Sequence, residues 1–250
     1  MASTRSDSAG AMRLGRSGMP NIWFGSKPAR SYRHERSVTR RNPKGGAARL
    51  DTAKTQSIMP LTIPILYGSL RRDRVGIRVV RFLSAALRRR GHEVMVVDAA
   101  EKQLPLLDRM YKEYSAGAAP PVLEELAQLY RRADGFVVVA GEYNHGIQPG
   151  LSNLLDHFLE EYFFRPSAIA CYSAGAFGGV RAAMALRMTL AELGMPSIPS
   201  LLPVPRVQEA FDLDGVPHDP AWEQRSDRFL AEFEWYARAL KAERRRGVPY

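Results

Sequence analysis

The sequence predicts an α/β fold built on a doubly wound, five-stranded parallel sheet. Short apolar runs alternate with segments of helical spacing, and polar, glycine-bearing loops separate them. The run from Phe136 to Ala140 is apolar throughout and rich in β-branched residues, which is typical of a strand covered on both faces. Right-handed, helix-length crossovers between such strands place helices on both faces of the sheet.

Strands and helices are expected in alternation along the chain. The expected strands cover residues 61–67, 93–98, 136–140, 168–172 and 197–204. The expected helices cover residues 75–90, 122–132, 149–159, 180–193 and 221–240. Five strands in this alternation favour the flavodoxin-like strand order 2-1-3-4-5.

Glycine and proline positions support these boundaries. Gly91 and Gly194 are suited to end two of the helices, and Pro149 lies in a first helical turn, where proline is tolerated. Pro64 is awkward inside the first strand, and it is tolerated near an end or where ladder bonding lapses. The fifth strand contains prolines, so we expect it at an edge of the sheet.

The positive charge of the chain is concentrated before the predicted domain. The formal net charge is +10, but residues 1–58 hold 12 Lys and Arg against 3 Asp and Glu, whereas residues 59–250 hold 24 against 23. We therefore expect a basic, disordered leader over residues 1–58 and a folded domain over residues 59–250. An N-terminal extension or early start, an organelle transit peptide, and a nucleic-acid or membrane tail all fit the leader. A start at Met59 would still yield the whole predicted domain.

Cysteine usage and hydropathy bear on the cellular compartment. The single cysteine, Cys171, excludes an intramolecular disulfide and fits a reducing, cytoplasmic setting. It lies in an apolar strand, where we expect a small buried hydrophobe rather than a redox group. No apolar run approaches the roughly 18 residues that a membrane span needs. Nucleic acid is an unlikely partner for the domain, whose charge is nearly balanced.

The loop after the first strand is suited to a phosphate monoester. It offers the Ser69 hydroxyl, the Arg71 guanidinium and backbone N–H groups at a helix N-terminus. It lacks the GxxxxGK[ST] spacing of a nucleoside triphosphate site, and it is not a GxGxxG loop. In open α/β sheets, ligands bind outside the carboxyl ends of the strands, where this loop lies.

Two further loops at the same edge are suited to a planar ring. The loop after the third strand offers Tyr143, Asn144 and His145 between glycines. The loop after the fourth strand is rich in glycine, which lets backbone N–H groups approach a flat ring; its glycines are Gly175, Gly178 and Gly179. A phosphate pocket beside a ring pocket fits FMN better than other common ligands.

At these residues the chain resembles the NAD(P)H-dependent FMN reductase family, which includes flavin, quinone, azo-dye and chromate reductases. The motifs are GSLR, EYNHGIQPGLSNLLD and YSAGAFGG, and the resemblance covers about Leu61 to Arg206. It implies that the FMN phosphate is held by Ser69, Arg71, Arg74, Val75 and Gly76. It implies that the isoalloxazine and a dimer partner are bordered by Glu142, Tyr143, Asn144, His145 and Gly146. It implies that the polar edge of the ring is held by Ser173, Ala174, Gly175 and Ala176.

The resemblance also implies an activity and an assembly. NADPH or NADH would be the co-substrate, a small-molecule acceptor would receive the electrons, and the chain would form a homodimer or a dimer of dimers. No side chain is expected to be catalytic and no metal is expected, because the flavin N5 carries the chemistry.

The chain departs from the family pattern at several positions. Arg74 and Gly76 stand where many members have Ser and Asn, although some quinone-reductase-like members carry Arg at the first position. Gly141 stands where proline is usual, and Ser152 stands where lysine is common. None of these differences removes the predicted flavin site.

The alternative function is that of a non-enzymatic electron carrier. A flavodoxin-type electron carrier would share the fold, and NAD(P)H oxidation would distinguish an enzyme from it.

His145 fits either a proton donor or a contact with a dimer partner, and His157 is expected on a helix surface. Asp156, Glu160 and Glu161 are expected on a solvated or interface helix face.

Overall fold

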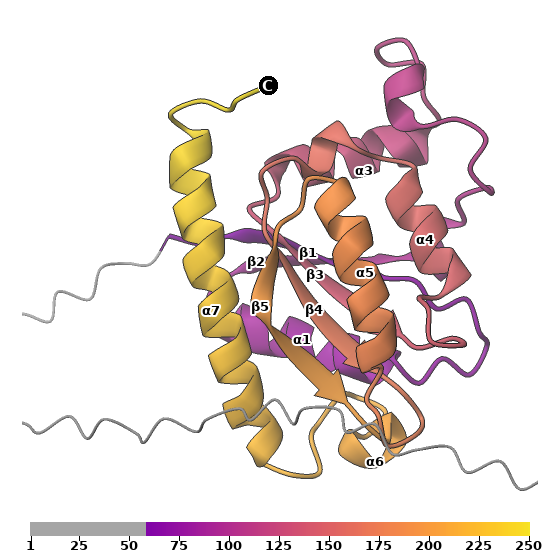
Figure 1. Ribbon diagram of the computed structural model, residues 1–250, viewed down its shortest axis with the longest axis vertical. Helices are drawn as coiled ribbons and strands as arrows, with labels where there is room; N and C mark the ends of the chain where they lie inside the picture. Colours follow the sequence, from indigo (N-terminus) through magenta and orange to yellow (C-terminus); the bar gives the residue numbers. More distant parts are fainter. Residues whose placement is uncertain (1–58) are drawn as a thin grey trace, which may run out of the picture. The chain divides into compact units, whose positions relative to one another are not determined.

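The computed structural model describes residues 59–250 (Figure 1). The predicted leader, residues 1–58, lies outside the described residues. The strands are β1 (Thr62–Tyr67), β2 (Glu93–Asp98), β3 (Phe136–Gly141), β4 (Ser167–Tyr172) and β5 (Ser197–Val204). The helices are α1 (Ile77–Arg89), α2 (Ala99–Lys102), α3 (Pro121–Arg132), α4 (Pro149–Asp156), α5 (Val180–Glu192), α6 (Val207–Ala210) and α7 (Ala221–Arg244). Two 3₁₀ turns, η1 (Tyr111–Glu113) and η2 (Glu160–Tyr162), lie between them.

The strands form one parallel sheet in the order β2-β1-β3-β4-β5, as the sequence predicts. All side chains of β3 and β4 are buried, which explains why their sequences are apolar without alternation. β5 lies at an edge, as its prolines suggest, and its register with β4 shifts between Ser167 and Ile169.

Helices cover both faces of the sheet (Figure 1). One apolar core joins one face of the sheet to α1, α6 and α7. The other core joins the opposite face to α3, α4 and α5. The layers therefore match the doubly wound arrangement expected from right-handed crossovers.

Pro64 is accommodated inside β1 because one side of the strand is not yet paired at that position. The amide of Thr62 faces β3 and donates to the Asp134 carboxylate at 3.0 Å. Since amides on one side of a strand recur every second residue, position 64 also faces β3. The β1–β3 ladder begins one residue later, at Ile65. The missing N–H of Pro64 therefore removes no ladder bond.

The amino ends of the strands are tied to α7 by two buried polar clusters. In the first, His92 accepts from the Leu61 amide through Nδ1 at 3.3 Å, and its Nε2 lies 2.8 Å from Glu234. Arg90 binds the same carboxylate through Nε and Nη2. Burial would raise the pKa of Glu234, but the bonds from His92 and Arg90 outweigh burial and lower it to about 2.

The second cluster is centred on Asp134, directly before β3. Its carboxylate, 6% exposed, accepts from the Thr62 amide and from Lys241 Nζ at 2.8 Å. Arg244 lies 3.6 Å from the other carboxylate oxygen. The last helix thus holds β1 and β3 together at the edge where both strands begin.

Three expectations about the segment after Pro149 are wrong. α4 ends at Asp156, before the predicted Leu159, and the chain turns inward there. His157 is only 1% exposed and its Nδ1 lies 2.6 Å from the Asn153 carbonyl, so it is not on a surface. Glu161 is 3% exposed and pairs with Arg131 at 2.9 Å, so it is not on a solvated face.

No helix within residues 59–250 is both long enough and apolar enough to cross a membrane.

Candidate functional site

The loops after β1, β3 and β4 meet at the carboxyl edge of the sheet and enclose a cavity of about 130 Å³. Its walls are formed by Ser69, Arg71, Asp73, Arg74, Val75, Gly141, Glu142, Tyr143, Tyr172, Ser173 and Ala174. Most of the residues predicted for the phosphate and the ring are therefore brought together. The volume is below the roughly 300–1,000 Å³ of a typical ligand pocket, so the cavity can enclose only part of a larger ligand.

The first loop is drawn against the start of α4 by two glycines. A Cβ at Gly68 would lie 2.2 Å from the Leu151 Cβ, and a Cβ at Gly150 would lie 2.6 Å from the Gly68 carbonyl oxygen. Only glycines allow this approach. It holds Ser69, which is 2% exposed, at the cavity wall.

Among the arginines of this loop that line the cavity, Arg71 is the one that remains available to a ligand. Its side chain is exposed at the cavity, and within residues 59–250 it makes no ion pair or side-chain hydrogen bond. The backbone N–H groups of Val75 and Gly76, just before α1, donate to no described residue. An unpaired guanidinium beside amides at a helix N-terminus is the chemistry that binds a phosphate group.

Arg74 has a different role from Arg71. Its Nη1 lies 2.5 Å from Asp98 at the end of β2 and 3.4 Å from the Ser69 carbonyl oxygen. Its guanidinium also lies 5.7 Å from the centre of the Tyr67 ring. Arg74 therefore holds the first loop against the sheet, and its charge is largely matched by Asp98.

The loop after β3 is a tight hairpin. Tyr143 and Gly146 exchange both backbone hydrogen bonds at 2.9 Å, and Asn144 and His145 occupy the tip with φ of 49° and 66°. Such values are costly for residues other than glycine and are tolerated best by Asn, Asp and His. The tip side chains are exposed and lie outside the cavity wall.

Glu142 lines the cavity and also binds α5. Its carboxylate accepts from the backbone N–H of Arg181 at 3.3 Å and from the Arg181 guanidinium at 3.1 Å. That guanidinium is also 4.2 Å from the centre of the Phe177 ring. The contacts attach the third loop to α5 and neutralise the Glu142 charge, which leaves Asp73 as the unneutralised carboxylate at the cavity.

The loop after β4 is held in a defined shape by Ser173. Its hydroxyl donates to the Gly175 carbonyl and accepts from the Gly178 amide, each at 2.9 Å. Gly178 and Gly179 have φ of 65° and 78°. The amides of Gly175 and its two neighbours donate to no described residue, so this loop presents backbone donors to a ligand.

A set of buried contacts at the site, made by Gln148, Gly141 and Tyr172, was not predicted from the sequence. Gln148 accepts from the Gly141 amide and donates to the Tyr172 hydroxyl, both at 2.8 Å and both buried. A Cβ at Gly141 would lie 2.7 Å from the Gln148 amide nitrogen and from the Tyr172 ring. Gly141 therefore supplies the N–H group for one of these hydrogen bonds, and its lack of a side chain leaves room for both. Together the two bonds fix the position at which the hairpin begins. Tyr172 ends a predicted strand at the ligand edge, which was the available signal.

Gly76, predicted to contact phosphate, also makes room for the Tyr172 ring. A Cβ there would lie 2.1 Å from the ring. Burial raises the pKa of the Tyr172 phenol, and the neighbouring Tyr67 raises it further. The hydroxyls of Tyr67 and Tyr143 are buried and have no hydrogen-bond partner within residues 59–250. Tyr143 lines the cavity, where an unsatisfied donor of this kind is suited to a polar ligand.

Cys171 is buried in β4, as expected. Burial raises the pKa of its thiol to about 12, which keeps it protonated at neutral pH. No cluster of three or more His, Cys, Asp or Glu side chains suited to a metal occurs in the described part of the chain.

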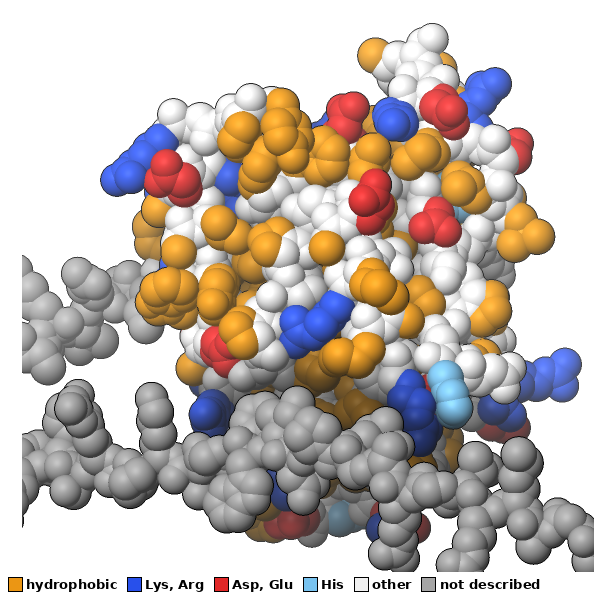
Figure 2. Space-filling model, in the orientation of Figure 1, with side chains coloured by type: hydrophobic (Ala, Val, Ile, Leu, Met, Phe, Trp, Pro, Cys, Tyr) orange, Lys and Arg blue, Asp and Glu red, His pale blue; other side chains and the backbone are white. Residues whose placement is uncertain are grey.

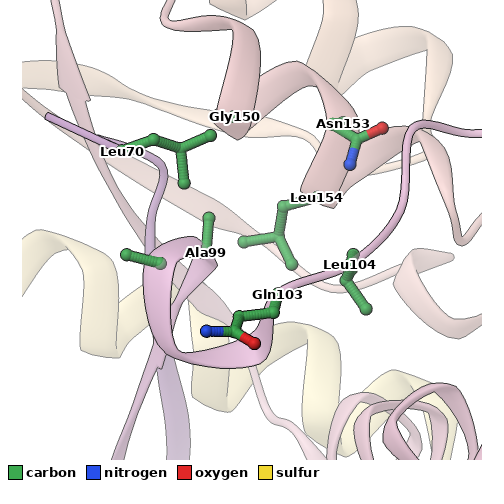
Figure 3. Close-up of a pocket in the computed structure, with 8 residues that line it drawn as sticks. Leu70, Ala99, Gln103, Leu104, Gly150, Asn153 and Leu154 are labelled. Atoms are coloured by element: carbon green, nitrogen blue, oxygen red, sulfur yellow. The ribbon is translucent and has the colours of Figure 1, made fainter.

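A second cavity, of about 310 Å³, lies between Leu70, α2 and α4 (Figure 3). Figure 3 shows Leu70, Ala99, Leu104 and Leu154 around it, with Gln103 at one wall. The amide of Asn153 is already engaged by the Leu107 amide and the Pro105 carbonyl. Since this cavity offers no charged side chain, it does not suit a phosphate, and the cavity beside Arg71 is the better site.

Residues 61–209 match the family described as NADPH-dependent FMN reductase. A quinone reductase of Escherichia coli is 31% identical over 136 residues, which cover 52% of this chain and 69% of that protein. An NAD(P)H-dependent FMN reductase of Pseudomonas aeruginosa is 29% identical over 128 residues, which cover 49% and 69%.

Solved structures show the same fold. The flavoenzyme NAD(P)H:(acceptor) oxidoreductase FerB of Paracoccus denitrificans aligns with a TM-score of 0.56 and 19% identity. The alignment covers 73% of this chain and 98% of that one.

Proposed function

Because the chain belongs to the NADPH-dependent FMN reductase family, we propose that it binds FMN at the Arg71 cavity and passes electrons from NAD(P)H to a small acceptor. The main observation in support is that the unpaired Arg71 guanidinium lies beside Ser69 and the backbone amides before α1. The loops after β3 and β4 line the same cavity; the first forms the hairpin and the second presents backbone N–H donors. Phosphate and ring chemistry thus lie side by side at the ligand edge of the sheet.

The residues present fit FMN. Arg71, Ser69 and the amides of Val75 and Gly76 would hold the phosphate, while Arg74 would position their loop. Tyr143 and the exposed hairpin tip would border the ring. The amides of residues 174–176 would donate to the polar edge of the ring, and Ser173 would keep that loop in shape.

FMN, when bound, supplies the chemistry by taking a hydride from the nicotinamide and giving electrons to the acceptor. The protein orients the ring between the hairpin and the loop after β4. The amide donors of that loop would stabilise negative charge on the polar edge of the ring, because they are already oriented and need not reorganise. The hydrogen bonds of Gln148 keep the hairpin in place.

A quinone is the first acceptor to test, because the Escherichia coli relative is named a quinone reductase; a flavin, an azo compound and a metal oxyanion are the other candidates. We place the enzyme in the cytoplasm, since its one cysteine is a buried thiol. We also propose a homodimer, or a dimer of dimers, in which the exposed Asn144 and His145 contact the neighbouring protomer.

An absorbance experiment tests this function. Purified protein is mixed with FMN, separated from excess flavin, and titrated without oxygen with NADPH and with NADH. Retained flavin that is bleached by either nucleotide, and reoxidised by a quinone, is the expected result. Retained flavin that neither nucleotide bleaches would instead indicate an electron carrier, and failure to retain FMN would refute the site.

A further inference from the structure

A groove of about 500 Å³ lies between β5 and the first turns of α7, apart from the Arg71 cavity. It is lined by Ser200, Leu201, Leu202, Pro203, Pro205, Arg225, Arg228 and Phe229. Its volume is within the range of small-molecule pockets. In Figure 1 the start of α7 lies beside α6, just beyond the end of β5. The groove thus opens at the same edge of the sheet as the candidate flavin site.

Two arginines give the groove an unbalanced positive charge. Within residues 59–250, no carboxylate lies within 4.0 Å of Arg225 or Arg228, and neither side chain makes a hydrogen bond. The Arg225 guanidinium is stacked 4.9 Å from the centre of the Trp222 ring. The nearby Glu232 carboxylate is occupied by the hydroxyl and the amide of Ser200. Figure 2 shows Lys and Arg side chains interspersed with Asp, Glu and hydrophobic ones on the visible face of residues 59–250.

The opposite wall of the groove is apolar. Leu201, Leu202, Pro203 and Phe229 supply aliphatic and aromatic surface, and the proline has no N–H to offer. A peptide strand paired with this edge would therefore lose a ladder bond at Pro203. An apolar wall facing two guanidinium groups suits a flat base that carries a phosphate.

Two lining residues of the groove, Pro203 and Pro205, lie against the loop that presents backbone donors to the proposed ring site. A Cβ at Gly178 would lie 3.0 Å from the Pro203 side chain and 3.1 Å from the Pro205 nitrogen. The Arg206 amide donates to the Gly175 carbonyl at 2.9 Å. Ser173 and Ala174 of this loop line the Arg71 cavity. One ligand could thus reach both cavities by crossing a single loop.

We propose that this groove binds the adenosine end of NADPH, with Arg225 and Arg228 contacting the 2′-phosphate and the apolar wall packing against adenine. The inference rests on the proposed function, and it makes NADPH the preferred co-substrate. Both arginines lie beyond residue 209, outside the segment that matches the family. The preference is therefore carried by the last helix of this chain.

The test uses binding to the flavin-free protein as well as turnover. Calorimetry compares adenosine 2′,5′-bisphosphate with adenosine 5′-monophosphate, which lacks the 2′-phosphate. We expect the bisphosphate to bind the wild-type protein at least about 10-fold more tightly, because hydrogen bonds to charged groups are strong. Arg225→Gln combined with Arg228→Gln should remove that difference, and Arg228→Lys should keep part of it.

Arg245→Gln is the matched control, since Arg245 is exposed near the end of α7, away from the groove. In the flavin-loaded protein, the double variant should raise KM for NADPH about 10-fold while kcat and KM for NADH stay unchanged. The proposed adenosine site would be refuted if both probes bound the wild-type protein equally, or if the double variant kept the preference for the bisphosphate. If bound FMN were still bleached by NADPH, such a result would refute the adenosine site and not the proposed reductase function. Failure of the protein to bind FMN would refute the reductase function itself.

Discussion

The two edges of the sheet differ in how completely their polar groups are paired. At the amino edge, the Asp134 carboxylate is contacted by Lys241, Arg244 and the Thr62 amide. The Glu234 carboxylate is contacted there by Arg90 and His92. At the carboxyl edge, Arg71 and the hydroxyl of Tyr143 have no partner within residues 59–250, and loop amides donate to no described residue. His145 there also holds a left-handed conformation.

This difference separates stability from binding. Groups that are satisfied inside the protein stabilise the fold and are not available to a ligand. Unpaired groups and positive φ values cost stability and persist where a ligand can use them. Substitutions at the amino edge should therefore change unfolding without changing FMN affinity, and substitutions at the carboxyl edge should do the reverse.

The largest effect is expected for Asp134→Ala at the amino edge. The change leaves the Thr62 amide, Lys241 and Arg244 without their carboxylate, so the free energy of unfolding should fall by about 3 kcal/mol. Urea denaturation measures it. Arg246→Gln, which breaks the exposed pair with Glu243, is the control and should cost under about 0.5 kcal/mol. A loss of FMN affinity with unchanged stability would break the comparison.

Arg71→Ala tests the carboxyl edge. FMN affinity should fall about 10- to 100-fold, because a charged hydrogen-bond donor to the phosphate is lost, while urea stability stays the same. Flavin fluorescence titration measures the affinity. Arg72→Ala is the matched control, since its neighbouring exposed cation does not line the cavity. Near-wild-type affinity in Arg71→Ala would show that the phosphate lies elsewhere.

Glu234→Gln sharpens the comparison through pH. The pKa of Glu234 is lowered from 4.5 to about 2, so its stabilisation is complete above about pH 4.5 and disappears as the pH falls towards 2. Wild-type protein should lose about 1.5 kcal/mol more stability than the variant between these values. Glu223→Gln, at an exposed pair of 3.9 Å, should behave like wild type. Parallel curves for wild type and Glu234→Gln would refute the assignment.

The smallest effect is expected for Tyr143→Phe. Its hydroxyl is buried without a partner at the cavity, so removing it should change the free energy of unfolding by less than about 0.5 kcal/mol. FMN affinity should fall about 3-fold if the hydroxyl serves the ligand. Tyr130→Phe removes a similar hydroxyl in the core beneath α3 and should leave FMN affinity unchanged. Equal FMN affinities in the two variants would count against a ligand role for Tyr143.

The fold could be predicted because its signals are local. The apolar continuity of β3 and β4 and the helical spacing between strands specify a covered parallel sheet, and the predicted strand order is confirmed. Helix ends were less certain. The spacing of Leu154, Leu155, Phe158 and Leu159 continues past Asp156, where α4 stops, because these side chains enter the same core from the following turn. This explains why the surface placement of His157 was wrong.

The site could be predicted only where its groups are close in sequence. Ser69 and Arg71 follow a strand directly, so their convergence on the ligand edge needed no tertiary information. The pairing of Arg74 with Asp98 and the contact of Gln148 with Tyr172 each join residues 24 positions apart. These contacts depend on strand register, for which the sequence has no local signal. Because Arg74 pairs with Asp98, Arg74 supports the loop while Arg71 remains available to a ligand.

The contacts of α7 with the amino edge also constrain the order in which the protein can be completed during synthesis. Glu234, Lys241 and Arg244, which are the α7 partners of His92 and Asp134, are translated after every residue that lines the Arg71 cavity. Chains are synthesised from the N-terminus onward. A nascent chain can therefore assemble its carboxyl edge while its amino edge still lacks these partners.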